Sequence, residues 1–168
     1  MKRVMILGQP GAGKSTLARD LAARTGLPVV HMDKIHWQSG WVARPLAHKI
    51  EMIRAEEEKD RWIIEGGLSA TFESRAARAD LMLWIDIGLS LRVWRVLRRT
   101  WRSRGRSRPD LPEGCPEKFD AETLDFLRFI WRTRLSARRR IETQYAAFQG
   151  QKHRFGSLRE IEAWLAAL

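Results

Sequence analysis

The stretch GQPGAGKST at residues 8–16 has the residue types and spacing of a phosphate-binding loop. Four positions match the pattern G-x-x-x-x-G-K-[ST]: Gly8, Gly13, Lys14 and Ser15. Glycines let the backbone turn its N–H groups toward an anion, and a helix beginning here would add a positive dipole end. Lys14 offers a point charge to the β- and γ-phosphates, and the Ser15 hydroxyl can ligate Mg²⁺.

The sequence around this loop supports a nucleotide site that takes ATP with Mg²⁺. A short apolar run, RVMIL, precedes the loop, and KSTLARDLAARTG follows it with helical periodicity. A strand before and a helix after are the context that a phosphate-binding loop needs. The residues expected to contact the nucleotide phosphates are Gly8, Gly11, Ala12, Gly13, Lys14, Ser15 and Thr16.

Strand-like and helix-like segments alternate along the rest of the chain. Strands are predicted at residues 3–7, 27–33, 61–67, 80–86 and, more weakly, 152–156; helices are predicted at 14–24, 44–59, 71–79, 91–103, 120–148 and 157–168. This alternation predicts the α/β class, with a three-layer α/β/α fold of the P-loop NTPase type around a five-stranded parallel sheet. Ligands of such folds bind at the carboxyl ends of the strands.

The chain is expected to form a single P-loop kinase-like domain, residues 1–168, with a small lid inside it. Residues 103–120 break the pattern with three prolines and two glycines between helical segments, and this segment is interpreted as the lid. On the helix before it, Leu91, Trp94, Leu97 and Trp101 are predicted to face inward. Most of the eight tryptophans are expected in the core, with Trp37 either there or in a substrate pocket.

The composition indicates anionic partners and a cytoplasmic location. The formal net charge is +11, and arginine supplies 24 of the 31 basic side chains. Eight arginines and no acid lie within residues 92–108, and six more within 128–140. Such a field favours nucleotides, nucleic acid or acidic lipid. The single cysteine excludes an internal disulfide, and no apolar run reaches the roughly 18 residues of a membrane span.

The chain resembles the nucleoside monophosphate kinases, adenylate kinase in particular. The closer resemblance is to the adenylate kinase-related branch called "DNA topology modulation protein". It is carried by HMDKIHW (31–37), WIIEGGLSATFESRAARAD (62–80) and RGRSRPDLPEGCPEKFD (104–120), in addition to the phosphate-binding loop. The resemblance implies ATP as the phosphoryl donor and a small-molecule acceptor, with nucleoside monophosphates among the candidates.

Arginines around the lid gain roles from this resemblance. Arg95 would lie over the adenine, and Arg99, four residues later on the same helix face, would reach the phosphates. After the lid, WRTRL places Arg132 and Arg134 where related kinases clamp the transferred phosphoryl group, and Arg134 is taken as the catalytic one. The alternative is that these arginines belong to a solvated basic surface.

Acidic residues at strand ends complete the predicted site. By resemblance, Glu65 holds Mg²⁺ through water beside Ser15, with Asp86 as the competing acid. Asp33, after the second strand, would orient or deprotonate an acceptor hydroxyl, unless it only caps a turn. The flanking His31 and His36 have no metal-ligand company and are expected to be structural or solvent-facing.

Two departures from adenylate kinase concern the acceptor. The two places of its acceptor-phosphate arginines hold His36 and Ser69, while Arg44, Arg75 and Arg78 lie nearby but displaced. The favoured function is therefore an ATP-dependent phosphotransferase whose acceptor the sequence does not name. The alternative is a nucleic-acid-binding protein regulated by nucleotide, which the charge favours and the lack of a recognised nucleic-acid module opposes. The sequence indicates neither a membrane partner nor an oligomeric state.

Overall fold

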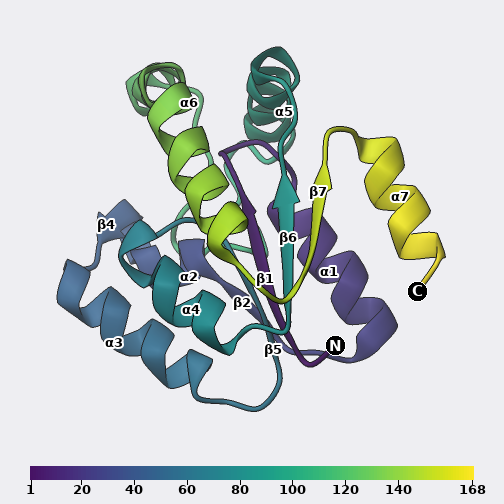
Figure 1. Ribbon diagram of the computed structural model, residues 1–168. Helices are drawn as coiled ribbons and strands as arrows, with labels where there is room; N and C mark the ends of the chain where they lie inside the picture. The colour runs from purple at the N-terminus through teal and green to yellow at the C-terminus, as the bar shows by residue number, and fades with distance from the viewer.

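The computed structural model describes residues 1–168 and has a parallel five-stranded sheet at its centre (Figure 1). The order across the sheet is β2-β5-β1-β6-β7, and every neighbouring pair is parallel. The strands are β1 (Arg3–Gly8), β2 (Val29–His31), β5 (Trp62–Glu65), β6 (Leu81–Ile85) and β7 (Gln151–Phe155). The predicted five-stranded parallel sheet is confirmed.

Helices cover both faces of the sheet, which confirms the three-layer prediction (Figure 1). One face carries α1 (Lys14–Thr25) and α7 (Leu158–Ala166). The other carries α2 (Met32–His36), α3 (Leu46–Glu57), α4 (Phe72–Arg78) and the long α6 (Ala121–Ala147). The remaining helix, α5 (Leu89–Arg102), lies beyond the carboxyl end of β6. No helix has both the length and the apolar character that crossing a membrane requires.

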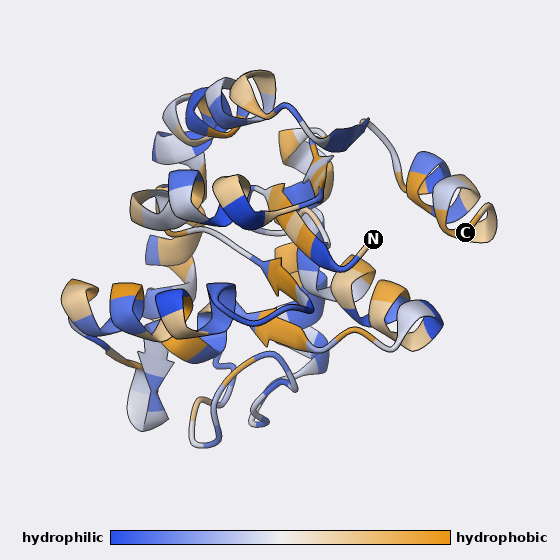
Figure 2. Ribbon diagram, turned by 60° about the horizontal axis from the view of Figure 1, so that its bottom comes forward, coloured by the Kyte–Doolittle hydropathy of each residue, from blue (hydrophilic) through white to orange (hydrophobic).

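The central strands are buried on both faces, as their near-continuous apolar sequences predict. In β1, Val4 and Ile6 pack into the cluster under α1 and α7, whereas Met5 and Leu7 pack into the cluster under α2, α3, α4 and α6. Figure 2 shows these apolar strands in orange between helices of mixed character. The two apolar clusters, one on each face, therefore hold the parallel strands so that their carboxyl ends lie together at one edge of the sheet.

The acceptor-side segment after β2 differs from the sequence prediction. The strand predicted at 27–33 is shorter, because the chain enters α2 directly after His31. A small antiparallel hairpin follows, formed by β3 (Trp37–Gln38) and β4 (Val42–Ala43) and closed by the 3₁₀ turn η1 (Ser39–Trp41). We refer to residues 37–43 as the acceptor-side hairpin.

Helix α5 presents the opposite face to the one predicted from its apolar residues. Its buried residues are Arg92, Val96 and Thr100, while Leu91, Trp94 and Trp101 are exposed. The predicted inward apolar face is therefore wrong. The physical reason is that α5 packs on the polar backbone of the phosphate-binding loop and on a carboxylate of residues 103–120, to which Arg95 and Thr100 donate hydrogen bonds.

The expectation of a tryptophan-rich core is also wrong. Only Trp62 and Trp84 are buried, and both lie in central strands. Trp94, Trp101 and Trp131 are exposed, at 53%, 68% and 57% of their surface. All three come from α5 and α6, the helices on either side of residues 103–120. On these helices the apolar residues are not the ones that are buried.

Candidate active site

The phosphate-binding loop runs from the end of β1 to the start of α1, as predicted. Gly11 and Gly13 have φ values of 79° and 103°, in the left-handed region that favours glycine. A Cβ at Gly11 would collide with the backbone carbonyl of Arg92, and one at Gly13 would lie 2.8 Å from the Arg95 guanidinium. Helix α5 therefore closes against this loop, and glycine is needed for that approach.

Lys14 and Arg95 both lie at this loop. The Lys14 ammonium donates a hydrogen bond to the Gln9 carbonyl (3.2 Å). Burial lowers the pKa of Lys14, and the nearby carboxylates of Glu65 and Asp33 oppose that shift only in part. Arg95 donates to the Ala12 carbonyl (3.1 Å), so its guanidinium lies against the loop. The roles of Lys14 at the phosphates and of Arg95 at the adenine stay predictions.

The structure brings Ser15 and Glu65 together. Glu65 ends β5, the strand directly beside β1, and its side chain is almost fully buried. The Ser15 hydroxyl donates to Glu65 Oε1 (2.9 Å), and His31 Nδ1 lies 2.7 Å from the same oxygen. A hydroxyl and a carboxylate are hard oxygen ligands of the kind Mg²⁺ takes, with phosphate and water completing its shell. The pair therefore fits the metal of Mg·ATP.

Asp86, the competing acid, is held by two arginines. Arg138 Nε and Nη2 donate to its two oxygens (3.1 and 3.0 Å), and Arg154 Nε adds a third contact (3.1 Å). Burial alone would raise the pKa of Asp86, but these arginines outweigh it and the net shift is downward. Asp86, directly after β6, thus joins Arg154 of β7 to Arg138 within α6.

We expect Glu65→Gln to raise the Mg²⁺ concentration needed for activity by at least about tenfold, whereas Asp86→Asn should leave it unchanged. Asp86→Asn should instead lower the free energy of unfolding by about 1–2 kcal/mol, since its partners are half exposed and partly screened. Because the folded-state pKa of Asp86 is depressed, this contribution is present above the unfolded pKa and is lost as pH falls through the folded value. Thermal melts and Mg²⁺ titrations at several pH values test both; a raised Mg²⁺ requirement in Asp86→Asn would contradict the assignment.

Asp33 lies on α2 and faces the phosphate-binding loop across the site. Its side chain reaches solvent, yet the surrounding protein still desolvates the carboxylate. That burial raises its pKa, and the negative charge of Glu65 adds to the effect, against the opposing pull of Lys14 and Arg108. The charges that act on Asp33 therefore come from the loop, from β5 and from the lid. This position suits a proton acceptor at the acceptor side of the site.

Residues 103–120, predicted to be a lid and called the lid below, supply acids that the sequence analysis did not pair with Arg99. Glu117 is buried and accepts a hydrogen bond from Thr100 (3.2 Å), with Arg99 Nε 3.7 Å away. Arg108 lies 2.7 Å from Glu117 and 2.7 Å from Asp110. Two of the eight arginines of this segment, Arg99 and Arg108, are thus paired with acids that follow them in sequence. Asp110 is two residues from Arg108, whereas Glu117 lies more than two helical turns from either arginine, so local spacing did not reveal its pairing.

Asp110 brings the lid over the phosphate-binding loop. It is buried, and burial alone would raise its pKa. Arg108 and the local backbone outweigh that effect, so the net shift of the Asp110 pKa is downward. The Ser15 hydroxyl, which donates to Glu65, also lies close to the Asp110 carboxylate.

The lid also contacts the acceptor-side hairpin. Gly40 N–H donates to the Gly114 carbonyl (2.9 Å), and Trp41 Nε1 donates to the Pro116 carbonyl (3.1 Å). The buried Cys115 thiol donates to the Gln38 carbonyl (3.1 Å). Trp37 packs edge-on against Trp41, at 5.4 Å between ring centroids, and so supports the hairpin from within.

Arg134 meets the phosphate-binding loop through its backbone. The Gln9 side chain donates to the Arg134 carbonyl (2.7 Å). Its guanidinium stacks on Trp131 of the same helix, 4.1 Å from the ring centroid, and donates to the Trp131 carbonyl. The neighbouring Arg132 is exposed. A catalytic role for Arg134 stays a prediction and requires its side chain to turn toward the loop.

Two of the displaced acceptor-side arginines, Arg44 and Arg75, donate hydrogen bonds to backbone carbonyls. Arg44 Nη1 donates to the carbonyls of Lys34, Ile35 and Trp37 at the end of α2. Arg75 is fully buried and donates to three carbonyls of the loop after Glu65, and burial lowers its pKa to about 10, so it stays charged at neutral pH. The Arg75 guanidinium is therefore fully engaged within the protein, whereas Arg44 uses only Nη1 in these contacts.

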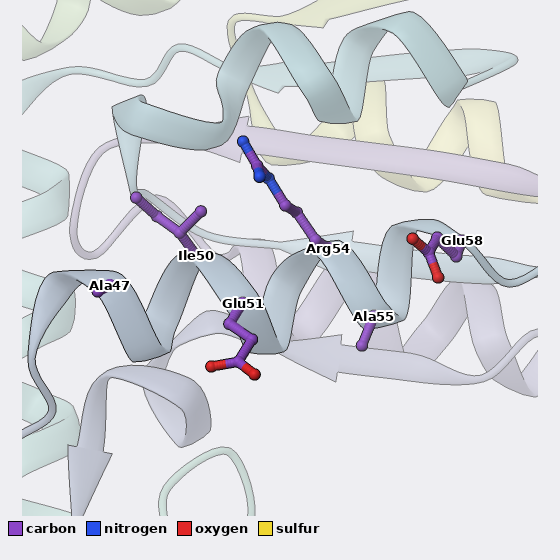
Figure 3. A pocket seen from close by; sticks show the side chains of 6 residues that line it. All are labelled: Ala47, Ile50, Glu51, Arg54, Ala55 and Glu58. Carbon is purple, nitrogen blue, oxygen red and sulfur yellow. The ribbon is translucent and has the colours of Figure 1, made fainter.

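A surface pocket along α3 is not part of this site. It measures about 530 Å³, as Figure 3 shows from close by. All of its lining residues belong to that region: Ala47, Ile50, Glu51, Arg54, Ala55 and Glu58. No residue of the phosphate-binding loop borders it. The candidate active site is therefore defined by its convergent side chains and not by this pocket.

Comparison with solved structures identifies the fold. No protein-family model matches the chain, and no curated protein matches it in sequence. The crystal structure of shikimate kinase from Bacteroides thetaiotaomicron is similar, with a TM-score of 0.53 and 18% sequence identity. The match covers 99% of this chain and 95% of that one. The chain therefore has the P-loop α/β fold of that kinase from end to end, and at this identity the likeness concerns the fold.

Proposed function

We propose that the protein is an ATP-dependent phosphotransferase that acts on a hydroxyl group of a small molecule. The observation that carries the proposal is the convergence of three elements at the carboxyl ends of the strands. Lys14 and Ser15 come from the phosphate-binding loop, Glu65 from β5 and Asp33 from α2. The charge of Glu65 raises the pKa of Asp33 and the charge of Lys14 lowers it. Asp33, on the proposed acceptor side, is therefore close to the residues proposed to bind the ATP phosphates and metal.

The residues divide the reaction between positioning and charge stabilisation. Lys14 and the loop N–H groups hold the β- and γ-phosphate oxygens, and Arg99 approaches from α5. Ser15, and Glu65 through water, would hold Mg²⁺, which would supply positive charge to the phosphates. Asp33 accepts the proton of the acceptor hydroxyl, whose oxygen forms the new bond to the γ-phosphorus while the bond to the β–γ bridging oxygen breaks and ADP leaves.

The acceptor is proposed to lack a phosphate group. A desolvated phosphate needs charged donors, and leaving it unpaired costs several kcal/mol. His36 and Ser69 replace two arginines of adenylate kinase, and Arg44 and Arg75 are engaged by backbone carbonyls. The solved kinase of the same fold is named for shikimate, which is likewise not a nucleotide. These points support a hydroxyl acceptor over AMP.

A screen for ADP release tests this proposal. The purified protein is incubated with Mg·ATP and a panel of shikimate, sugars, amino alcohols, hydroxy acids and nucleoside monophosphates. We expect ADP release with at least one hydroxyl compound and background release with AMP. Turnover with nucleoside monophosphates alone would overturn the acceptor class, and no acceptor-dependent turnover with any class would overturn the phosphotransferase.

One observation favours nucleic acid as a second candidate partner. Two exposed tryptophans, one on α5 and one on α6, each have an arginine guanidinium over the ring. Arg98 lies 5.0 Å from the Trp94 ring centroid, and Arg134 lies 4.1 Å from the Trp131 ring centroid. Indole stacking and arginine contacts bind single strands without sequence preference. Affinity for a single-stranded oligonucleotide that falls steeply with salt and changes with nucleotide supports this candidate; phosphoryl transfer unaffected by added DNA favours the first.

A further inference from the structure

His31 shares the carboxylate that is proposed to hold the metal. The parallel register pairs His31 of β2 directly with Glu65 of β5. The two side chains meet at the carboxyl end of the sheet, with His31 Nδ1 2.7 Å from Glu65 Oε1. Both are well shielded, at 10% and 3% exposure. The pairing register of β2 with β5 therefore brings these two side chains together.

Both hydrogen bonds to Glu65 fall on one oxygen. Ser15 Oγ and His31 Nδ1 approach Oε1, and Oε2 accepts no hydrogen bond from the protein. An ionised carboxylate only accepts, so Nδ1 of His31 carries the proton in this contact. Two donors on Oε1 fix the plane of the carboxylate and leave Oε2 available. Neutral and charged donors of this kind orient the ligands of metal sites.

Glutamate makes this support necessary. A glutamate side chain has one methylene and one rotatable bond more than an aspartate side chain. A longer side chain has more orientations to lose before it can bind a metal-bound water. The hydrogen bond from His31, added to that from Ser15, restricts the orientation of the Glu65 carboxylate.

We propose that His31 is a positioning residue that holds the Glu65 carboxylate in the orientation required for the metal of Mg·ATP. The inference rests on the proposed function, in that it assumes a metal–nucleotide complex at the phosphate-binding loop. The proposed role of His31 uses only its Nδ1, through Glu65. No group of three histidine, cysteine or acidic side chains forms a metal cluster in the structure.

The test compares two substitutions in the full-length protein. His31→Leu removes the donor at similar size, and His31→Asn keeps an N–H near the position of Nδ1. Mn²⁺ binding is titrated by electron paramagnetic resonance with a saturating nonhydrolysable ATP analogue. We expect His31→Leu to weaken Mn²⁺ binding about tenfold and His31→Asn to restore most of the affinity. His153→Leu, at a histidine packed on Phe155 and Trp164, serves as the matched control.

Metal-free nucleotide binding, measured in EDTA, should be equal in all variants, because His31 acts through Glu65. Equal Mn²⁺ affinity in His31→Leu and wild type would overturn the proposal, as would equal losses in His31→Leu and His31→Asn. If His31→Leu does not fold, His31→Phe replaces it as the donor-free ring. This measurement needs neither acceptor nor turnover, so a protein that binds Mn·nucleotide without transferring phosphate would refute the proposed function and leave the role of His31 testable.

Discussion

Lys14→Ala is expected to reduce phosphoryl transfer by about 10²–10³-fold, the range found when one preorganised charge at a transition state is removed. The reason is that Lys14 is the cation of the phosphate-binding loop itself. Burial leaves the Lys14 ammonium poorly solvated and so lowers its pKa, and a bound phosphate would compensate for the lost solvation. The measurement is the rate of ADP release with the acceptor found by the screen.

The same substitution should leave the fold intact. The Lys14 ammonium makes one hydrogen bond within the protein, to the Gln9 carbonyl, and contributes little to the core. The thermal midpoint should therefore stay equal or rise. Lys59→Ala is the matched control, because Lys59 is an exposed lysine paired with Glu56 on the surface. Undiminished turnover in a well-folded Lys14→Ala protein would overturn the assignment of Lys14 to the nucleotide phosphates.

Asp33→Asn is expected to lower kcat by about 10²–10⁴-fold, the contribution of a positioned general base. Asparagine keeps the size of the side chain and cannot accept the acceptor proton. Affinity for Mg·ATP should change little, since Asp33 lies on the acceptor side. Asp20→Asn on the exposed face of α1 is the control. A similar loss in ATP affinity and in kcat would show that Asp33 binds the nucleotide instead.

The pH dependence of the rate gives a second test of Asp33. Burial and the charge of Glu65 raise its pKa above the usual value near ~3.9. Only the ionised carboxylate accepts a proton, so the rate should fall as pH is lowered through this raised pKa. The acid limb should therefore lie at higher pH than for an ordinary carboxylate. In Asp33→Asn the residual rate should lose this limb, and an unchanged limb would assign it to another group.

The fold followed from local patterns because each pattern had one physical solution. Apolar runs such as RVMIL and DLMLWID are too short for spanning helices and too uniform for half-exposed strands, so they form buried parallel strands. Glycine and lysine at fixed spacing then located the nucleotide loop. Helix α5 shows the limit of this approach, because its apolar residues predicted the wrong face. Its buried face is chosen by polar partners on the loop and lid, which lie far away in sequence.

The candidate site was predictable where strand ends determine it. Ser15 and Glu65 meet because β5 is the neighbour of β1, and the resemblance supplied that order. The partners of Asp86 and of Glu117 were not predictable, since no spacing links residue 86 to Arg138 or Arg154. His31 was expected to be structural or solvent-facing, and the register with Glu65 could only emerge once β2 and β5 were paired.

The contacts between the lid and the acceptor-side hairpin connect the two substrates of the proposed reaction. Gly114, Cys115 and Pro116 contact the hairpin, and the same lid places Asp110, which is paired with Arg108, near Ser15 of the phosphate-binding loop. A molecule that displaces the hairpin must therefore displace groups beside the nucleotide. Binding free energies coupled in this way are reciprocal, so whatever factor the acceptor imposes on ATP affinity, ATP imposes equally on the acceptor.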